Sequence, residues 1–192
     1  MESKILFPSR LKGKRVLVVG FGNSAGEIAV DLVEHGARPT ILARSAQTIV
    51  PRWFFQRLEH LLHTHVTPLL NIPFGWMVVL ASGLLVDPAA YLVQAVEYGD
   101  LSSLGFPLSW KGPTLKLLLD KEPPMMDIGT VECARRGLLT VIGNTGIKQV
   151  YENAVEFENS IKEPFDAIVW FVSLFFAFCC VQPLSMWPEE RF

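Results

Sequence analysis

The stretch Val16-Leu17-Val18-Val19-Gly20-Phe21-Gly22-Asn23-Ser24-Ala25 decides the fold of this chain. Its first four residues form an apolar run that is typical of a strand buried on both faces of a parallel sheet. Residues Ala25–Glu34 then carry the apolar stripe of a helix, and Thr40–Ala43 is a second short apolar run. Residues 15–45 therefore predict one βαβ unit, and the fold class is α/β.

The turn in this unit has the pattern of a dinucleotide-binding site. Gly20, Gly22 and Ala25 match the spacing G-x-G-x-x-G/A between a strand and a helix. Gly20 permits the tight turn, Gly22 leaves room for a pyrophosphate, and the small Ala25 lets the helix pack close to the strand. The helix N-terminus presents N–H groups to the phosphates, and Asn23 and Ser24 can add side-chain hydrogen bonds. The alternative is a glycine turn that binds nothing.

The end of the second strand indicates which nucleotide is bound. An NAD site carries an acidic residue there, which binds the ribose 2′-hydroxyl. This chain has Arg44 and Ser45 instead, and a cation beside a hydroxyl suits a 2′-phosphate. The sequence therefore predicts NADPH rather than NADH, unless Arg44 is a solvated loop residue.

Composition excludes several other classes of function. The 192 residues carry 17 basic and 19 acidic side chains, a net charge of −2, so no basic patch for nucleic acid is expected. The three cysteines, two of them adjacent, form neither a disulfide framework nor a metal site, which indicates a reducing, cytoplasmic location. Cys179-Cys180 is more simply interpreted as a pair of apolar packing residues than as a redox pair. His60 and His63 lack a metal-binding partner at a recognised spacing, so we expect no metal site.

The rest of the chain is predicted as an insertion followed by more strands. Residues 51–96 are apolar, with prolines and glycines, and suggest several helices. Ile72–Val86 is too short and too interrupted for a membrane span, so a buried or substrate-lining helix is preferred. Gly99–Pro124 is rich in turn residues and suggests a surface excursion. Later elements are predicted as a strand at 125–129, a short helix capped by Thr130, a strand at 138–142, a hairpin of 147–150 with 154–157, and a strand at 165–170.

Several of these residues resemble the flavin-containing monooxygenases, and most closely the plant YUCCA-type enzymes. The resemblance lies first in the string Lys14–Ala25, in Glu27–Ala29 and in Arg44-Ser45. Further pieces in the same order are Val50-Pro51-Arg52, Tyr98–Leu101, Gly112-Pro113, Asp127–Thr130, Gly137 with its strand, and Phe165–Val169. It covers residues 11–169, most of the chain.

The resemblance implies a flavoprotein with two dinucleotide-binding domains, in which NADPH reduces FAD and the reduced flavin oxygenates a small substrate such as indole-3-pyruvate. An earlier glycine motif binds FAD in that family, and this chain starts too close to the NADPH motif to contain it. We therefore expect a fragment that binds NADPH, lacks the FAD motif and is inactive alone. No catalytic acid, base or nucleophile is assigned, and Asp127 is as consistent with a turn or capping role as with a ligand contact.

The family's return turn after the 165–169 strand is absent, and the sequence continues as an apolar tail. The predicted domains are thus an NADPH-binding domain at 11–169, with a helical insertion at 51–96, and an atypical hydrophobic tail at 170–192. Residues 167–184 are apolar enough to suggest poor solubility or membrane association. As a foreign extension, the tail should be removable after about Val169 with a gain in solubility.

Three functions remain open from sequence. The first is an oxidoreductase fragment of the flavin monooxygenase family. The second is a non-catalytic NADP-binding pseudoenzyme module, or the product of a splice variant or an erroneous gene prediction. The third is a membrane-attached protein whose tail is the functional feature. A simple single-domain NADP reductase is disfavoured because no Tyr-x-x-x-Lys pair is found.

Overall fold

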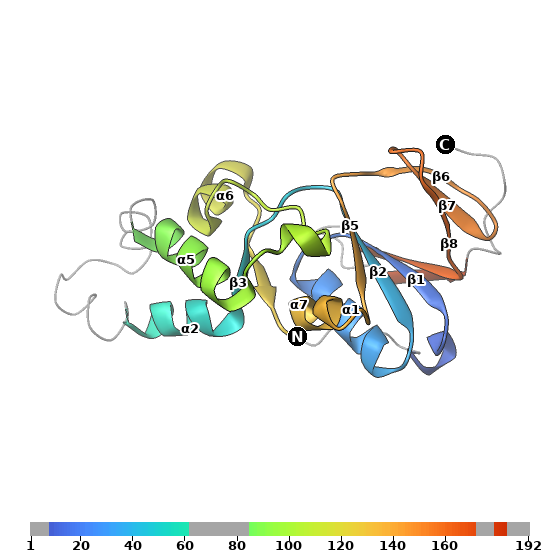
Figure 1. The fold of residues 1–192 in the computed structure, drawn as a ribbon, viewed down its shortest axis with the longest axis horizontal. Helices are drawn as coiled ribbons and strands as arrows, with labels where there is room; N and C mark the ends of the chain where they lie inside the picture. Colours follow the sequence, from blue (N-terminus) through green and yellow to red (C-terminus); the bar gives the residue numbers. More distant parts are fainter. Residues whose placement is uncertain (1–7, 62–84, 172–178, 184–192) are drawn as a thin grey trace. The chain divides into compact units, whose positions relative to one another are not determined.

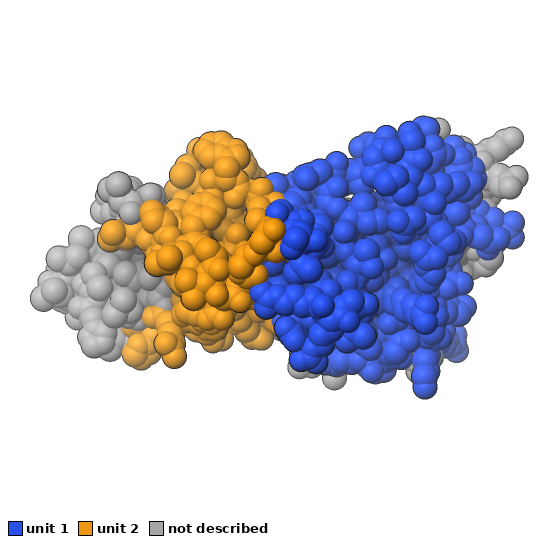
Figure 2. Space-filling model, viewed as in Figure 1, with its two compact units in different colours: residues 1–46, 101–107, 129–192 blue, residues 47–100, 108–128 orange. Residues whose placement is uncertain are grey.

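The structure is a computed structural model that describes residues 8–61, 85–171 and 179–183. It contains two compact units that are each interrupted in sequence (Figure 2). Unit 1 comprises residues 1–46, 101–107 and 129–192, and unit 2 comprises residues 47–100 and 108–128. The chain therefore leaves unit 1 after the second strand and returns to it twice.

Unit 1 is built on a five-stranded sheet with the order β10-β9-β1-β2-β5. The strands are β1 (Arg15–Val19), β2 (Arg38–Ala43), β5 (Thr140–Gly143), β9 (Ala167–Phe171) and β10 (Cys179–Pro183). The first four run parallel, and β10 is an antiparallel edge strand beside β9. The predicted βαβ unit and the parallel α/β sheet are confirmed.

Both faces of this sheet are covered, as the apolar run in β1 predicts. Helix α1 (Asn23–Glu34) packs on β1 and β2, and α7 (Thr130–Arg135) packs on α1 (Figure 1). The opposite face meets a three-stranded antiparallel sheet of β6 (Ile147–Val150), β7 (Ala154–Phe157) and β8 (Lys162–Pro164). A buried cluster joins the two sheets through Leu17, Leu42, Val150, Val155, Phe157, Phe165 and Ile168. Two short 3-10 turns, η1 (Pro8–Leu11) and η4 (Ser102–Leu104), also belong to the described part of unit 1.

The start of β9 is tied to the start of β1 by backbone and side-chain bonds. The Arg15 N–H donates to the Asp166 carboxylate at 2.8 Å, and the Asp166 N–H donates to the Arg15 carbonyl at 2.8 Å. The guanidinium of Arg15 lies 5.7 Å from the centre of the Phe165 ring. Asp166, the residue directly before β9, therefore fixes the register of β9 against β1.

In its described residues, unit 2 consists of two short paired strands and three helices. Strand β3 (Ile49–Pro51) runs parallel to β4 (Met125–Asp127), and the helices are α2 (Arg52–Leu61), α5 (Asp87–Tyr98) and α6 (Pro113–Asp120). Helices α2 and α5 lie side by side in Figure 1, and their shared core is Val50, Phe54, Val86 and Ala90. The strand predicted at 125–129 is confirmed.

Some local predictions are wrong. Gly99–Pro124 is not a surface excursion, because it contains helix α6 and the buried residues Leu101 and Phe106. Thr130 does not cap its helix: Gly129 occupies the cap position, and Thr130 is the first helical residue, fully buried with no hydrogen-bond partner for its hydroxyl. The hairpin at 147–157 is confirmed, but strand β8, which extends it, is not predicted.

The apolar tail falls partly outside the described residues. Residues 172–178 and 184–192 are not described, but the backbone of Cys179–Pro183 pairs with β9 in register, with Val181 opposite Val169. A cut after Val169 would also remove the last two residues of β9. Most of Ile72–Val86 also lies outside the described ranges, and within those ranges no helix has the length and apolar character needed to cross a membrane.

Candidate functional site

The glycine turn leaves the sheet at the carboxyl ends of β1 and β2. Val19 pairs with Leu42, and the N–H of Gly20 donates to the carbonyl of Leu42 at 3.1 Å. Gly20 has φ +133°, a value that side chains rarely allow, so a glycine is needed for the chain to turn here. Helix α1 begins three residues later, at Asn23.

Gly22 is different, because nothing in the protein requires it to be glycine. Its backbone is extended, with φ −120° and ψ −174°, a conformation open to any residue. A Cβ built at Gly22 would meet no heavy atom within 4 Å. The open space above Gly22 therefore fits a ligand that approaches the backbone closely, as a pyrophosphate does in this motif.

The helix after the turn is packed tightly against the sheet. Ala25 is 1% exposed, and Gly26 is also buried, so α1 lies close to the strands at its first turn. The N–H of Gly26 donates to the carbonyl of Gly22 at 3.1 Å, which closes that turn. Asn23 and Ser24, the first two residues of α1, are half-buried beside this turn. The first N–H groups of a helix point toward its N-terminus. The arrangement suits an anion at the N-terminus of α1.

Arg44 and Ser45 follow β2 at the same edge of the sheet. Because β1 and β2 are parallel with Val19 opposite Leu42, the glycine turn and the Arg44-Ser45 turn leave the sheet beside each other. Both Arg44 and Ser45 are exposed. All seven residues proposed from sequence thus lie in unit 1, five in the turn and the first turn of α1, and two directly after β2.

Sequence analysis does not predict one further segment that lies at the carboxyl ends of the strands. Residues 101–107 return to unit 1 and lie against β5, where the backbone of Gly105 contacts that of Val141. From this segment Phe106, 2% exposed, packs on Phe21 of the glycine turn, with ring centres 5.6 Å apart. No local pattern marks Phe106, because its partner is distant in sequence.

A cavity of about 630 Å³ lies at the opposite ends of these strands, among Arg15, Arg38, Thr140, Gly137 and Glu163. It lies at the amino ends of the strands, away from the glycine turn. Ligands of open parallel sheets bind at the carboxyl ends. We therefore place the candidate site at the glycine turn rather than in this cavity.

Other pieces of the family resemblance meet within unit 2. Pro51 is opposite Asp127 in the β3–β4 pair, and the Tyr98 hydroxyl donates to the Asp127 carboxylate at 3.2 Å. Gly112 lies against Asp87 so closely that an added Cβ would overlap the Asp87 carboxyl group. These residues build the frame of unit 2, where Asp127 is the last residue of β4 and its carboxylate accepts the bond from Tyr98.

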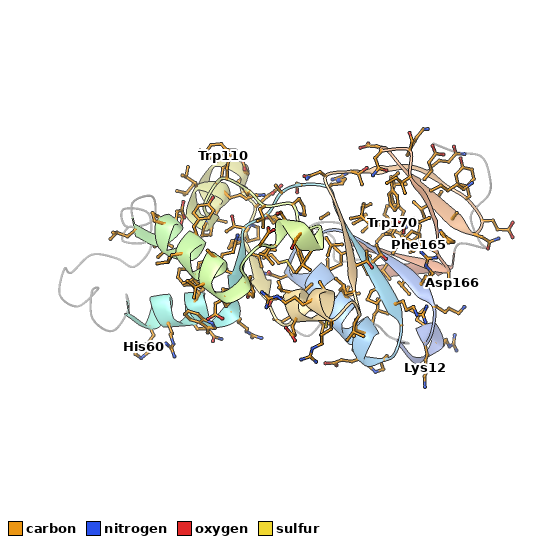
Figure 3. All side chains as sticks on the ribbon, viewed as in Figure 1. Lys12, His60, Trp110, Phe165, Asp166 and Trp170 are labelled. Carbon is orange, nitrogen blue, oxygen red and sulfur yellow. The ribbon has the colours of Figure 1, made fainter. Side chains whose placement is uncertain are left out.

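Within the described residues, no group of His, Cys, Asp and Glu is arranged to hold a metal ion. His60 is exposed on α2 (Figure 3), while His63 and His65 lie outside the described ranges. Cys133 is half-buried, and Cys179-Cys180 is part of β10.

Comparison with known proteins relates this chain to a family. Residues 3–78 match the model of the flavin-binding monooxygenase-like family. The chain is 36% identical over 159 residues to a probable indole-3-pyruvate monooxygenase, YUCCA10, of Arabidopsis thaliana. It is 33% identical over 157 residues to the indole-3-pyruvate monooxygenase YUCCA6 of the same plant. The chain is related to the YUCCA-type flavin monooxygenases. The matches cover 83% and 82% of this chain but only 37% and 34% of those relatives, so the chain spans about a third of their length.

Solved structures support the fold. A cyclohexanone monooxygenase in an open crystal form is 14% identical and has a TM-score of 0.54, over 83% of this chain and 40% of that one. A cyclohexanone monooxygenase from Rhodococcus sp. Phi1 bound to NADP+ has the same identity and TM-score, over 88% and 39%. At this identity the likeness shows only the fold, a parallel α/β sheet like that of flavin monooxygenases.

Proposed function

We propose that unit 1 binds NADPH at the carboxyl ends of β1 and β2. The observation that carries this proposal is that the Gly20–Ala25 turn and the Arg44-Ser45 turn leave the sheet beside each other, because Val19 is paired with Leu42. A dinucleotide laid across this edge meets the N-terminus of α1 with its pyrophosphate and the end of β2 with its adenosine ribose. The open space above Gly22 fits the pyrophosphate.

The preference for NADPH over NADH rests on charge at the end of β2. The sequence has no carboxylate at Ala43–Ser45 to bind a free ribose 2′-hydroxyl and repel a phosphate. Arg44 is exposed at that point, and its planar guanidinium can form two hydrogen bonds to one phosphate. Ser45 supplies a hydroxyl donor beside it.

The chain as a whole supplies the NADPH-binding part of a flavin-containing monooxygenase of the YUCCA type. Residues 11–169 form this part, with unit 2 inserted between β2 and α7, and the related proteins' names favour a small 2-oxo acid such as indole-3-pyruvate as substrate. NADPH supplies a hydride, and FAD accepts it in such enzymes. The turn and Arg44 orient the nucleotide, and no described residue is assigned to hold FAD.

The test is a titration of the protein with NADPH and NADH. Arg44→Ala should weaken NADPH binding by about 1.5–3 kcal/mol, the range for a hydrogen bond to a charged group, and leave NADH binding nearly unchanged. Arg38→Ala is the matched control, because Arg38 is an exposed arginine at the opposite end of the same strand. An unchanged preference for NADPH in Arg44→Ala would remove Arg44 from the site. Failure of the unmodified protein to bind either nucleotide would refute the proposed function.

A further inference from the structure

The glycine turn contains one large apolar side chain, Phe21, placed between two glycines. Gly20 and Gly22 have wide conformational freedom, so a turn made of them loses much entropy when it is fixed in one conformation. A phosphate site needs its N–H groups held in place before the ligand arrives. The side chain of Phe21 is only 7% exposed, so it is the part of the turn that the fold can anchor.

Phe106 is the aromatic residue that packs on Phe21. The two ring centres are 5.6 Å apart and the ring planes are inclined at 35°, within the range of favourable aromatic pairs. Phe21 belongs to the βαβ unit, whereas Phe106 comes from the separate segment 101–107 of the same unit 1. The contact therefore links the glycine turn to a second part of the chain.

The segment that carries Phe106 is itself rigidly placed. The N–H groups of Leu104 and Phe106 both donate to the carbonyl of Leu101, and Leu101 is fully buried. Gly105 has φ +86°, and a Cβ there would overlap the backbone of Val141. A Cβ on Gly143 would lie only 2.6 Å from the carbonyl oxygen of Gly105. The segment is thus in direct backbone contact with β5, and Phe106 presents a fixed surface to Phe21.

We infer that Phe106 is a positioning residue for the nucleotide site, because it holds Phe21 and thereby keeps the Gly20–Gly22 turn in its phosphate-binding conformation. This inference rests on the proposed function. It assigns a task in nucleotide binding to the segment 101–107, which the glycine motif does not include.

The first test needs no nucleotide. In the full chain, Phe106→Leu should speed hydrogen exchange of the Gly20 and Gly26 amides by about three- to tenfold, the effect of losing one aromatic pair. These amides donate to the carbonyls of Leu42 and Gly22. The matched control is Phe165→Leu, which removes one ring from another buried aromatic pair of unit 1, Phe157 and Phe165, whose ring centres are 6.3 Å apart. If both variants loosen the turn equally, or neither does, Phe106 does not position it.

The second test separates positioning of the pyrophosphate from general loss of fold. Phe106→Leu should weaken NADP+ binding by about three- to tenfold but leave binding of adenosine 2′-monophosphate, which has no pyrophosphate, unchanged. Phe21→Leu should have the same effect, and the double variant should be no weaker than either single one, because both act through one contact. Additive losses, or an equal loss for both ligands, would overturn the inference. If the unmodified chain binds no NADP+, the proposed function fails, while the exchange comparison still decides whether Phe106 holds the turn.

Discussion

At the scale of single residues, we expect Gly22 to be needed for nucleotide binding but not for folding. Gly22→Val should leave the protein folded, because the backbone is extended and a Cβ meets nothing within 4 Å, at a cost of about 1 kcal/mol for valine at the N-cap of α1. The same change should abolish NADPH binding, because the side chain occupies the path of the pyrophosphate. Nucleotide titration and thermal unfolding measure the two effects.

Gly20→Ala is the contrasting variant. Gly20 has φ +133°, so a side chain there strains the backbone and should lower the stability of the protein. Gly22→Val protein that is folded and binds NADPH with the original affinity would show that this turn does not hold phosphates.

The residues at the candidate site are of two kinds: some are placed by their spacing in the sequence, and one depends on a contact with a distant segment. The placement of Gly20, Gly22, Ala25 and Arg44 could be predicted from sequence, because it follows from spacing within a single βαβ unit. Phe106 could not, because its contact with Phe21 depends on how the segment 101–107 returns to the sheet. Sequence periodicity carries no information about such a return.

At the scale of elements, the start of α6 depends on a carboxylate from another helix. Asp87, in the first turn of α5 and 4% exposed, accepts the N–H of Thr114 at 2.9 Å and that of Leu115 at 3.2 Å. Asp87→Ala leaves these N–H groups unpaired and should destabilise unit 2 by about 1.5–3 kcal/mol. Urea unfolding, followed by the helical circular-dichroism signal, measures the loss.

The other end of α6 supplies the control for this prediction. Asp120 forms a part-exposed ion pair with Lys111, with both N–O distances at 2.8 Å. Asp120→Ala should cost less than about 1 kcal/mol, as surface pairs do. Equal losses for the two variants would mean that Asp87 acts only as another surface charge.

This capping contact also explains why α6 escaped prediction. The sequence before the helix, Lys111-Gly112-Pro113, has no side chain that caps it locally, and turn residues dominate the segment. The cap comes from a residue 27 positions earlier. By contrast, β1, α1, β2 and the 147–157 hairpin were predicted because their apolar periodicity and turn residues are contained within each element.

At the scale of the whole molecule, the residues that resemble the family are divided between the two units, so they do not all belong to one site. The glycine turn and Arg44 lie in unit 1, whereas Pro51, Tyr98 and Asp127 belong to unit 2, where Asp127 joins the other two. The resemblance in sequence therefore covers residues of both units: those of the proposed nucleotide site in unit 1 and those that build the frame of unit 2.

The last prediction concerns β10, the edge strand of the main sheet. It is the opposite of the expectation from sequence that removing the apolar tail improves solubility. Because β10 pairs with β9 from Cys179 to Pro183, ending the chain after Phe171 exposes the backbone N–H and C=O groups along the outer edge of β9. Ile168 and Val169 on that strand are fully buried. An unpaired apolar edge strand favours aggregation. The chain 1–171 should therefore be less soluble and unfold at lower temperature than the full chain.

A chain of residues 1–183 is the control, since it keeps β10 and removes only residues 184–192. It should match the full chain in soluble yield, unfolding temperature and NADPH affinity. If instead the chain 1–171 is as soluble and as stable as the chain 1–183, β10 contributes nothing to the sheet, and the apolar segment is an extension that the fold does not need. The comparison is decisive because the two shortened chains differ only in residues 172–183, the segment that contains β10.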